Sequence, residues 1–184
     1  MKKKVLVLLA EGFEEIEAVT SIDILRRAGL DVTVAGVGDV IVKGSRDIVL
    51  KTDIEIGSYK GSPDALVLPG GMPGVKNLSL SKKVNELIDK VYKNGKIIAA
   101  ICAAPAYVLA PKDILKGRKA TCYPDCRDMM EGKTKFVDEK VVVDRNIITS
   151  KGPGTAFDFA LKLVEKLAGK SVKEKVRKKI LYEK

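Results

Sequence analysis

KIIAAICAAPAYVLA, residues 96–110, is an apolar run that reaches a cysteine and continues through two alanines into a proline. The unbroken apolar run over 96–102 is typical of a parallel strand that is buried on both faces of a sheet. Pro105 stands in the expected first turn of a following helix, whose N–H groups need no acceptor within that helix. The stretch therefore predicts a strand, a sharp turn at Cys102 and a helix.

The same alternation extends outward along the chain. Apolar runs predict further strands at 5–10, 31–38 and 64–71, and helical patterns cover about 14–28 and 81–93. Buried strands separated by helices require a parallel sheet with both faces covered. The expected fold is α/β, a three-layer sandwich of the flavodoxin-like kind with a mainly parallel sheet. It is expected to be one domain spanning residues 1–184.

Two segments interrupt this alternation, VIVKGSRDIVLKTD at 40–53 and KTKFVDEKVVVDRNIITS at 133–150. Polar residues that favour turns divide them, such as Asp-Glu-Lys and Asp-Arg-Asn in the second segment. Both segments are predicted to form antiparallel hairpins added to the parallel sheet. A last helical pattern predicts a C-terminal helix over about 171–182.

Composition limits the class of protein. Of the 184 residues, 46% are hydrophobic and 32% are charged, as in soluble globular proteins, and no apolar segment approaches a membrane span of ~18 to 20 residues. The apolar stretch near the N-terminus stops at Glu11, which is too short for a signal peptide. Three cysteines cannot all pair, which favours a reducing compartment. A cytoplasmic protein without a membrane partner is expected.

The net charge of +10 is concentrated near one end of the chain. Residues 170–184 contain seven Lys or Arg and two Asp or Glu, a net charge of +5 and half of the total excess. The solvated face of a terminal helix explains this distribution. No aromatic interleaving or binding motif accompanies the basic residues, so nucleic acid is not an expected partner.

Reactive groups follow three of the predicted strands, at the edge where open parallel sheets bind ligands. AEGFEEIE supplies carboxylates, LPGGMPG supplies backbone N–H groups, and CAAP supplies the thiol of Cys102. A turn at a helix start favours thiolate, which would make Cys102 a nucleophile and the most acidic thiol of the chain. The alternative is an inert buried cysteine, because free cysteines are among the most buried residues.

The chain contains no histidine, so a proton partner for Cys102 must be a carboxylate, Lys, Tyr or water. Glu17 shares a largely apolar helical stripe with Phe13 and Ile24, which would desolvate its carboxyl and raise its pKa. An ordinary first-turn acid that complements the helix dipole is the competing interpretation, and it suits Glu14 and Glu15 better.

The other two cysteines, Cys122 and Cys126, stand in TCYPDCRD. This spacing lacks the further ligands that a structural zinc site needs, so no metal is expected. Ordinary reduced thiols are the first interpretation. A resolving role for Cys126 opposite Cys102 is a second hypothesis.

Seven motifs occur in an order that resembles the ThiJ/PfpI superfamily, in particular its parkinsonism-associated deglycase branch, the DJ type. They are VLVLLAEGFEEIEAV, LRRAGLDVTVAG, SRDIVL, LVLPGG, NLSLSKKV, IAAICAAP and TSKGPGTAFDFAL. The resemblance covers nearly the whole chain, including the C-terminal helix. It implies a homodimer that needs no cofactor.

The resemblance also implies roles for individual residues. Cys102 would be the reactive cysteine and Glu17 the acid that hydrogen-bonds its sulfur, with the N–H groups of Gly71 and Ala103 as an oxyanion site. The pocket would include Gly70, Tyr123, Arg27, Arg46 and Pro153. SKGPGT would form the far wall of the pocket, with Thr155 as a cap of the next helix.

The implied function is cysteine chemistry on small reactive aldehydes, of the glyoxalase or deglycase type. Tyr123 replaces a histidine that is usual in the family, and a phenol is a poor base at neutral pH. The alternative function is a non-enzymatic oxidative-stress sensor or chaperone-like protein that acts through a Cys102 sulfinate. A PfpI-type peptidase is disfavoured because Ala103 stands where that branch has histidine. A glutamine-amidotransferase-like fold is an analogy of fold alone.

Overall fold

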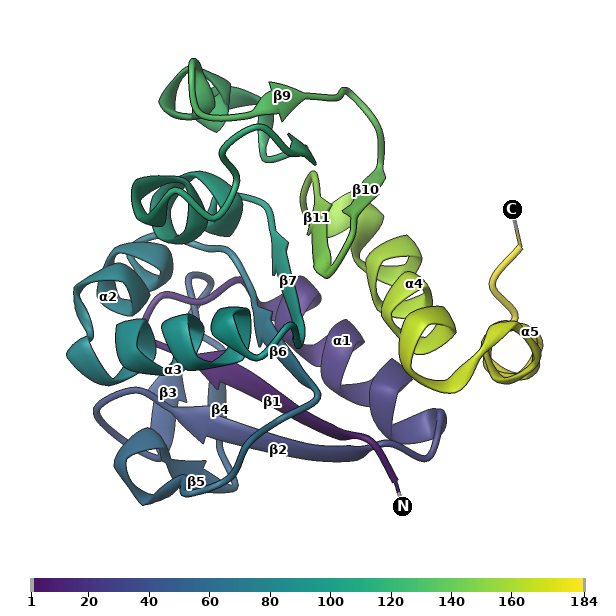
Figure 1. Ribbon diagram of the computed structural model, residues 1–184. Coiled ribbons are helices and arrows are strands. Elements are labelled where there is room, and N and C mark those ends of the chain that lie inside the picture. Colours follow the sequence, from purple (N-terminus) through teal and green to yellow (C-terminus); the bar gives the residue numbers. More distant parts are fainter. Residues whose placement is uncertain (1, 184) are drawn as a thin grey trace.

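A seven-stranded sheet lies at the centre of the molecule in the computed structural model, which describes residues 2–183 (Figure 1). Across the sheet the strands are β10 (Val141–Asp144), β11 (Ile147–Ser150), β7 (Ile97–Ile101), β6 (Ala65–Leu68), β1 (Lys4–Leu9), β2 (Asp31–Gly36) and β5 (Ile54–Glu55). All neighbouring strands are parallel except β10, which runs antiparallel to β11. β6 is buried throughout, and β1 and β7 are buried after their first residue. This burial explains the unbroken apolar runs in their sequences.

Helices cover both faces of this sheet, so the predicted three-layer α/β fold is confirmed. α1 (Glu15–Arg27) packs against α4 (Ala156–Ala168) on one face, and α2 (Gly74–Leu80) and α3 (Lys82–Lys93) lie on the other (Figure 1). The strand order explains this arrangement: β1 leads to β2 in one direction along the sheet and β6 leads to β7 in the other, so crossovers of the usual right-handed kind place their helices on opposite faces. The chain order therefore reverses between β1 and β6, where open sheets place their ligand sites.

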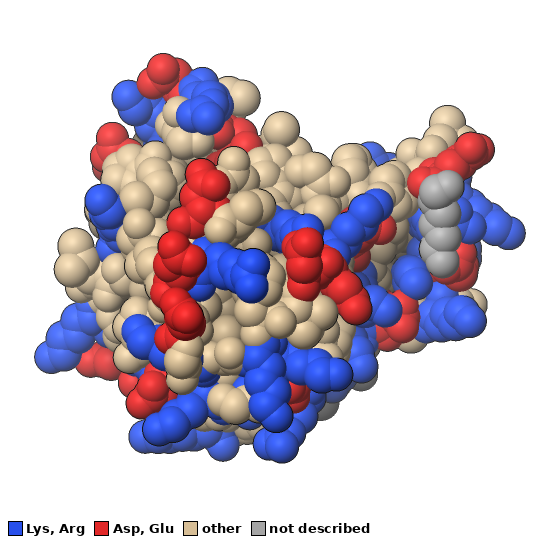
Figure 2. Space-filling view, turned by 90° about the horizontal axis from the view of Figure 1, so that it is seen from above, with Lys and Arg blue, Asp and Glu red and all other residues tan. Residues whose placement is uncertain are grey.

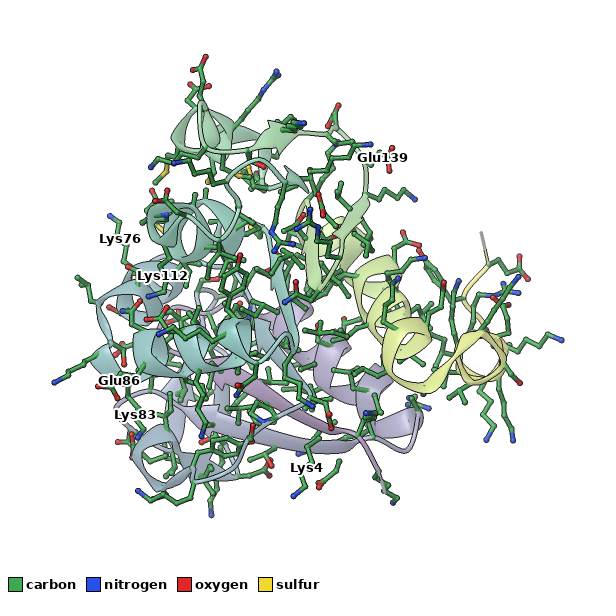
Figure 3. All side chains as sticks on the ribbon, in the orientation of Figure 1. Lys4, Lys76, Lys83, Glu86, Lys112 and Glu139 are labelled. Atoms are coloured by element: carbon green, nitrogen blue, oxygen red, sulfur yellow. The ribbon has the colours of Figure 1, made fainter. Side chains whose placement is uncertain are left out.

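The third helix, α3, shows how the sequence pattern fixes one of these layers. Its buried residues are spaced at helical intervals, and they are Val84, Leu87, Ile88 and Val91. Lys83 and Glu86 lie on the opposite, exposed face and point away from the sheet (Figure 3). The Ser81 hydroxyl accepts the Val84 N–H and caps the helix start.

Of the two predicted hairpins, the first forms as expected and the second forms only in part. β3 (Ile41–Lys43) and β4 (Val49–Lys51) pair antiparallel, but as a separate two-stranded sheet. In the second segment, only β10 and β11 form a hairpin, around the turn at residues 144–146. β9 (Lys135–Phe136) instead runs parallel to β8 (Lys119–Ala120). The N–H groups of residues 135 and 137 donate to carbonyls of residues 118 and 120, so this segment pairs there. Asp-Glu-Lys is therefore not the turn of a hairpin.

The C-terminal helix α5 spans Lys170–Lys179 and packs against α4. It ends earlier than the predicted residue 182, because Leu181 adopts a left-handed conformation with φ of 54°. The Leu181 and Tyr182 N–H groups donate to carbonyls of the last turn, the pattern of a Schellman motif. Glycine usually holds this position, and Leu181 offers no such signal, so the helix end could not be predicted from the sequence.

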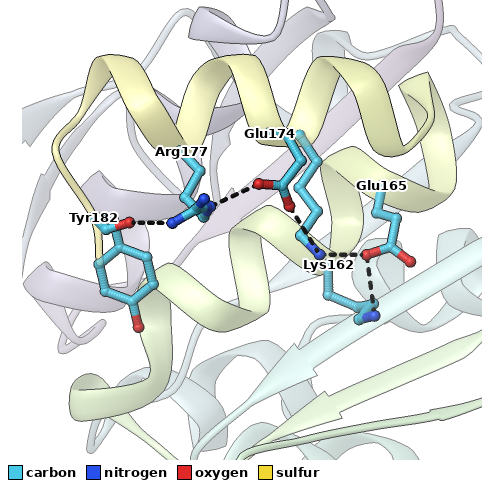
Figure 4. Close-up of polar contacts among 6 residues, drawn as sticks. Lys162, Glu165, Glu174, Arg177 and Tyr182 are labelled. Atoms are coloured by element: carbon cyan, nitrogen blue, oxygen red, sulfur yellow. Dashed lines mark hydrogen bonds and ion pairs between the residues drawn. The ribbon is translucent and has the colours of Figure 1, made fainter. Parts of the chain in front are cut away.

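Ion pairs tie the basic residues of α5 to acids nearby (Figure 4). Glu165 of α4 accepts from Lys173 at 2.7 Å and from Lys162 at 3.1 Å, and Glu174 accepts from Arg177 at 2.8 Å. Elsewhere, Lys and Arg side chains are interspersed with Asp and Glu on the face in Figure 2. Among residues 2–183, no helix is both long enough and apolar enough to cross a bilayer.

Candidate active site

Cys102 stands on a sharp turn directly after β7. Its φ is +65°, a left-handed conformation that costs an L-residue roughly 1–2 kcal/mol. Two backbone hydrogen bonds hold it there: its N–H donates to the Ser150 carbonyl at 3.0 Å, and its carbonyl accepts the Tyr123 N–H at 2.8 Å. Pro105–Leu109 then forms one short π-helical segment. The strand, turn and helical start expected from the sequence are all present.

Glu17 lies in the first turn of α1, and its side chain is fully buried. Its Oε2 accepts the Gly70 N–H at 2.7 Å. Its Oε1 is also buried and has no hydrogen-bond partner among the described residues, and the Cys102 thiol lies close enough to the carboxyl to interact with it. Burial raises the pKa of this carboxyl to about 8, against 4.5 for an ordinary Glu. The apolar helical stripe thus predicted the direction of the shift correctly.

The pKa of Cys102 is raised, contrary to the prediction of an acidic thiol. Burial is the largest cause, and an ionised Glu17 adds to it, whereas the N–H groups of Ala103 and Gly71 lower the pKa. The prediction relied on the helix start, whose Ala103 N–H does lower the pKa of Cys102, but burial outweighs this effect. Burial also raises the pKa values of the other two thiols, that of Cys122 to about 12.

The two groups titrate as a pair. With a pKa of about 8, Glu17 is mostly protonated at pH 7. A neutral carboxyl does not repel a thiolate, and its O–H can donate to the sulfur. When the pair loses one proton, the remaining proton can stay on Glu17 while the charge stays on Cys102. The buried pair is therefore suited to keeping a proton next to a nucleophilic sulfur.

Two consecutive glycines make room for this pair. A Cβ at Gly70 would lie 2.5 Å from Cys102 Cβ and 2.9 Å from Glu17 Oε2. Gly71 has a φ of +95°, and a Cβ there would overlap the backbone around Phe13. The close approach leaves the Gly71 and Ala103 N–H groups beside the sulfur, where the oxyanion site is predicted.

The thiol opens into a cavity of about 370 Å³. It is lined by Glu14, Ser45, Arg46, Gly71, Met72, Cys102, Ala103, Tyr107, Tyr123, Asp125, Cys126 and Pro153. Tyr123, Arg46 and Pro153 thus lie where the resemblance implies. Gly70 lies behind the sulfur and does not line the cavity.

Arg27 lies away from this cavity, so its predicted place in the pocket is wrong. It closes α1, ten residues after Glu17, which places its backbone ~15 Å along the helix. Its Nε donates to Asp23 at 2.5 Å on the exposed surface. The length of α1 thus separates Arg27 from Glu17. The resemblance of motifs placed Arg27 in the pocket without taking this distance into account.

Glu14 and Glu15 do more than complement the helix dipole. Glu14 caps α1 by accepting the Glu17 N–H at 2.8 Å, and it also lines the cavity. Glu15 is buried and accepts from the Arg46 backbone N–H and from the Ser45 hydroxyl. It therefore holds the β3–β4 turn, and with it Arg46, at the cavity. The role of Glu15 was not predicted from local sequence, because it depends on a loop 30 residues away.

Other lining residues were missed, and Thr155 stands at the predicted cap position of α4 without capping it through its side chain. Tyr107, Asp125 and Met72 lie within quoted stretches, but no local pattern marks them as lining residues, and only the folded chain brings them to the cavity of Cys102. The Thr155 hydroxyl bonds Gly152 and Ser150 within the SKGPGT loop and makes no capping bond to α4. Within the described part of the chain, no group of three or more His, Cys, Asp or Glu could hold a metal ion.

Comparison with known proteins gives consistent matches. The sequence profile of the DJ-1/PfpI family matches residues 3–166. Protein dj-1beta of Drosophila melanogaster is 44% identical over 184 residues, with 98% of each chain covered. Its crystal structure superimposes with a TM-score of 0.96 over 100% of both chains, at 42% identity. The glutathione-independent glyoxalase DJR-1.2 of Caenorhabditis elegans is 40% identical, covering 91% of this chain and 90% of its own.

Proposed function

The chain belongs to the DJ-1/PfpI family, and on this premise we propose that it converts small 2-oxoaldehydes such as methylglyoxal into 2-hydroxy acids without a cofactor. One observation supports this proposal above the others. A buried carboxyl that holds its proton at neutral pH lies directly behind a thiol that faces a cavity. A relative with a glyoxalase name adds support at 40% identity.

In the proposed reaction, the Cys102 sulfur adds to the aldehyde carbon and forms a hemithioacetal. The Gly71 and Ala103 N–H groups stabilise the oxygen as it gains charge, and Glu17 supplies the proton. A proton then leaves the former aldehyde carbon and one is added at the neighbouring carbonyl carbon. This step gives a thioester of a 2-hydroxy acid on Cys102. Water cleaves the thioester, so the net reaction adds one water and regenerates the thiol.

We expect Tyr123 to limit this activity, because it replaces a histidine that is usual in the family. It occupies the cavity wall where relatives usually have histidine, and its exposed fraction is 41%. Imidazole titrates near neutral pH and transfers protons well, whereas an ordinary phenol has a pKa of ~10. We therefore expect weak aldehyde turnover. Peptide hydrolysis is not expected, because Ala103 supplies no base beside the nucleophile.

The proposal is tested by incubating the purified protein with methylglyoxal and measuring loss of aldehyde together with formation of lactate. Cys102→Ser should abolish lactate formation. Cys122→Ser is the matched control, because this buried thiol does not line the cavity and should leave turnover unchanged. Lactate formation that is equal in Cys102→Ser and wild type would refute the proposal.

The second candidate function is an oxidative-stress sensor that acts through oxidation of Cys102. Tyr123 favours this candidate, since it removes the proton-transfer group of the aldehyde reaction. A protein that forms no lactate, but gains oxygen at Cys102 under mild peroxide, would support the sensor over the enzyme.

We also propose that the chain forms a homodimer through α1 and the β3–β4 hairpin. Large apolar side chains are exposed there: Ile16, Val19, Ile41, Ile48 and Val49, each between 46% and 55%. These residues lie on the two elements that Glu15 connects at the Ser45–Arg46 turn, which lines the cavity. Val49→Asp should yield a monomer by light scattering at micromolar concentration. Leu80→Asp, on α2 at 82% exposure, is the control that should leave a dimer.

A further inference from the structure

Two thiols line the same cavity. Cys102 reaches it from the end of β7, and Cys126 reaches it from the 3-10 helical segment Pro124–Met130. Each has an exposed fraction of 9%, so neither is sealed in the core. The proposed aldehyde reaction uses Cys102 and leaves Cys126 without a role.

The third cysteine differs from these two in position. Cys122 is fully buried and does not line the cavity. Its thiol donates to the Tyr123 carbonyl at 3.2 Å. Cys126 therefore shares the cavity into which a group formed on Cys102 would extend, whereas Cys122 does not line it.

Backbone hydrogen bonds connect the segment of Cys126 to the turn of Cys102. The Tyr123 N–H donates to the Cys102 carbonyl at 2.8 Å, and the Cys126 N–H donates to the Tyr123 carbonyl at 2.9 Å. The backbones of Cys102 and Cys126 are thus linked through Tyr123 by two hydrogen bonds. A disulfide needs a Cα–Cα distance of roughly 4.4–6.8 Å. The hydrogen bonds of a short 3-10 segment are weak, so the segment of Cys126 can shift to bring the two Cα atoms to this distance.

We propose that Cys126 is a resolving thiol that converts oxidised Cys102 into a reversible Cys102–Cys126 disulfide. A hydroperoxide is the oxidant: the Cys102 sulfur takes its terminal oxygen to form sulfenic acid, and the peroxide is reduced to water or an alcohol. Cys126 sulfur then attacks the sulfenic sulfur. The S–O bond breaks, and the hydroxyl leaves as water with the Cys126 proton. A thiol reductant restores both cysteines.

This disulfide competes with a second peroxide, which would take Cys102 irreversibly to sulfinate. It would also occupy the sulfur that the aldehyde reaction needs. The inference rests on the same reactive Cys102 as the proposed function, but it does not require aldehyde turnover. Oxidation would therefore switch the site off reversibly and protect it.

The test is a titration of the purified protein with hydrogen peroxide, followed by intact mass and non-reducing peptide mapping. Wild type should lose 2 Da, yield a linked 102–126 peptide pair and regain its mass with dithiothreitol. Cys126→Ser and Cys126→Ala should instead gain 32 Da at Cys102, with at least ~10-fold more sulfinate than wild type at equal peroxide. Cys122→Ser is the matched control and should behave as wild type.

Two results would overturn the proposal. One is sulfinate that accumulates equally in wild type and in both Cys126 variants. The other is a disulfide that links Cys122 to either of the other cysteines in wild type. Because the readout is mass and not lactate, failure here is distinguishable from failure of the aldehyde reaction.

Discussion

Raising the pH from 5 to 8 should destabilise the folded protein through Glu17. In the unfolded chain this carboxyl has the ordinary pKa of 4.5, and in the folded protein burial raises it to about 8. Between these values the folded state holds a proton that the unfolded state has released. The free energy of unfolding therefore falls as pH rises, and the linkage relation gives a loss on the order of 3 to 4 kcal/mol between pH 5 and pH 8.

The measurement is urea unfolding at pH 5, 6.5 and 8 on wild type and Glu17→Gln. Glutamine keeps a donor next to Cys102 but does not titrate, so subtracting the two curves isolates the contribution of Glu17. Wild type should lose on the order of 3 to 4 kcal/mol relative to the variant across this range. Glu86→Gln removes an exposed carboxyl from α3 and serves as the control. Parallel curves for wild type and Glu17→Gln would show that Glu17 is not buried as a protonated acid.

Three further predictions concern the turn, the glycines and the cavity wall. Cys102→Gly should be about 1 kcal/mol more stable than Cys102→Ala in urea unfolding, because only glycine adopts a φ of +65° without strain; equal stability would contradict this. Gly70→Ala should slow iodoacetamide labelling of Cys102 and lower the Tm, since the new Cβ would lie 3.0 Å from Sγ. Gly154→Ala, with no atom within 4 Å of its Cβ, is the control, and identical effects in both would argue against close packing as the cause. Tyr123→His should raise lactate formation from methylglyoxal by supplying an imidazole, and unchanged or lower activity would show that Tyr123 is not limiting.

The central sheet was predictable because its strands carry their own signal. β1, β6 and β7 are buried on both faces, so their sequences are apolar without interruption. The pairing of β9 was not predictable in this way. Backbone hydrogen bonds join this strand to residues 118–120. Such bonds do not depend on the identity of the side chains, so the sequence contains no pattern for the pairing.

In the candidate site, too, features with a local sequence pattern were predictable and features that depend on distant segments were not. Cys102 and Glu17 were predicted because a strand end and a helical stripe are local patterns. The raised pKa of Cys102 was missed because it depends on burial by distant segments and on the charge of Glu17. The contact of Glu15 with the Ser45–Arg46 turn likewise joins parts of the chain that no short pattern connects.

The hydrogen bonds around Cys102 have a consequence for how the protein is made. Its left-handed turn is held by the Ser150 carbonyl and by the Tyr123 N–H, which are translated well after it. A growing chain on the ribosome therefore carries Cys102 as an ordinary, flexible thiol until β11 has emerged. The strained turn and its buried acid therefore form only after residues 123 and 150 have been synthesised. Alkylation of Cys102 in arrested chains of increasing length would consequently report the moment at which the native fold closes.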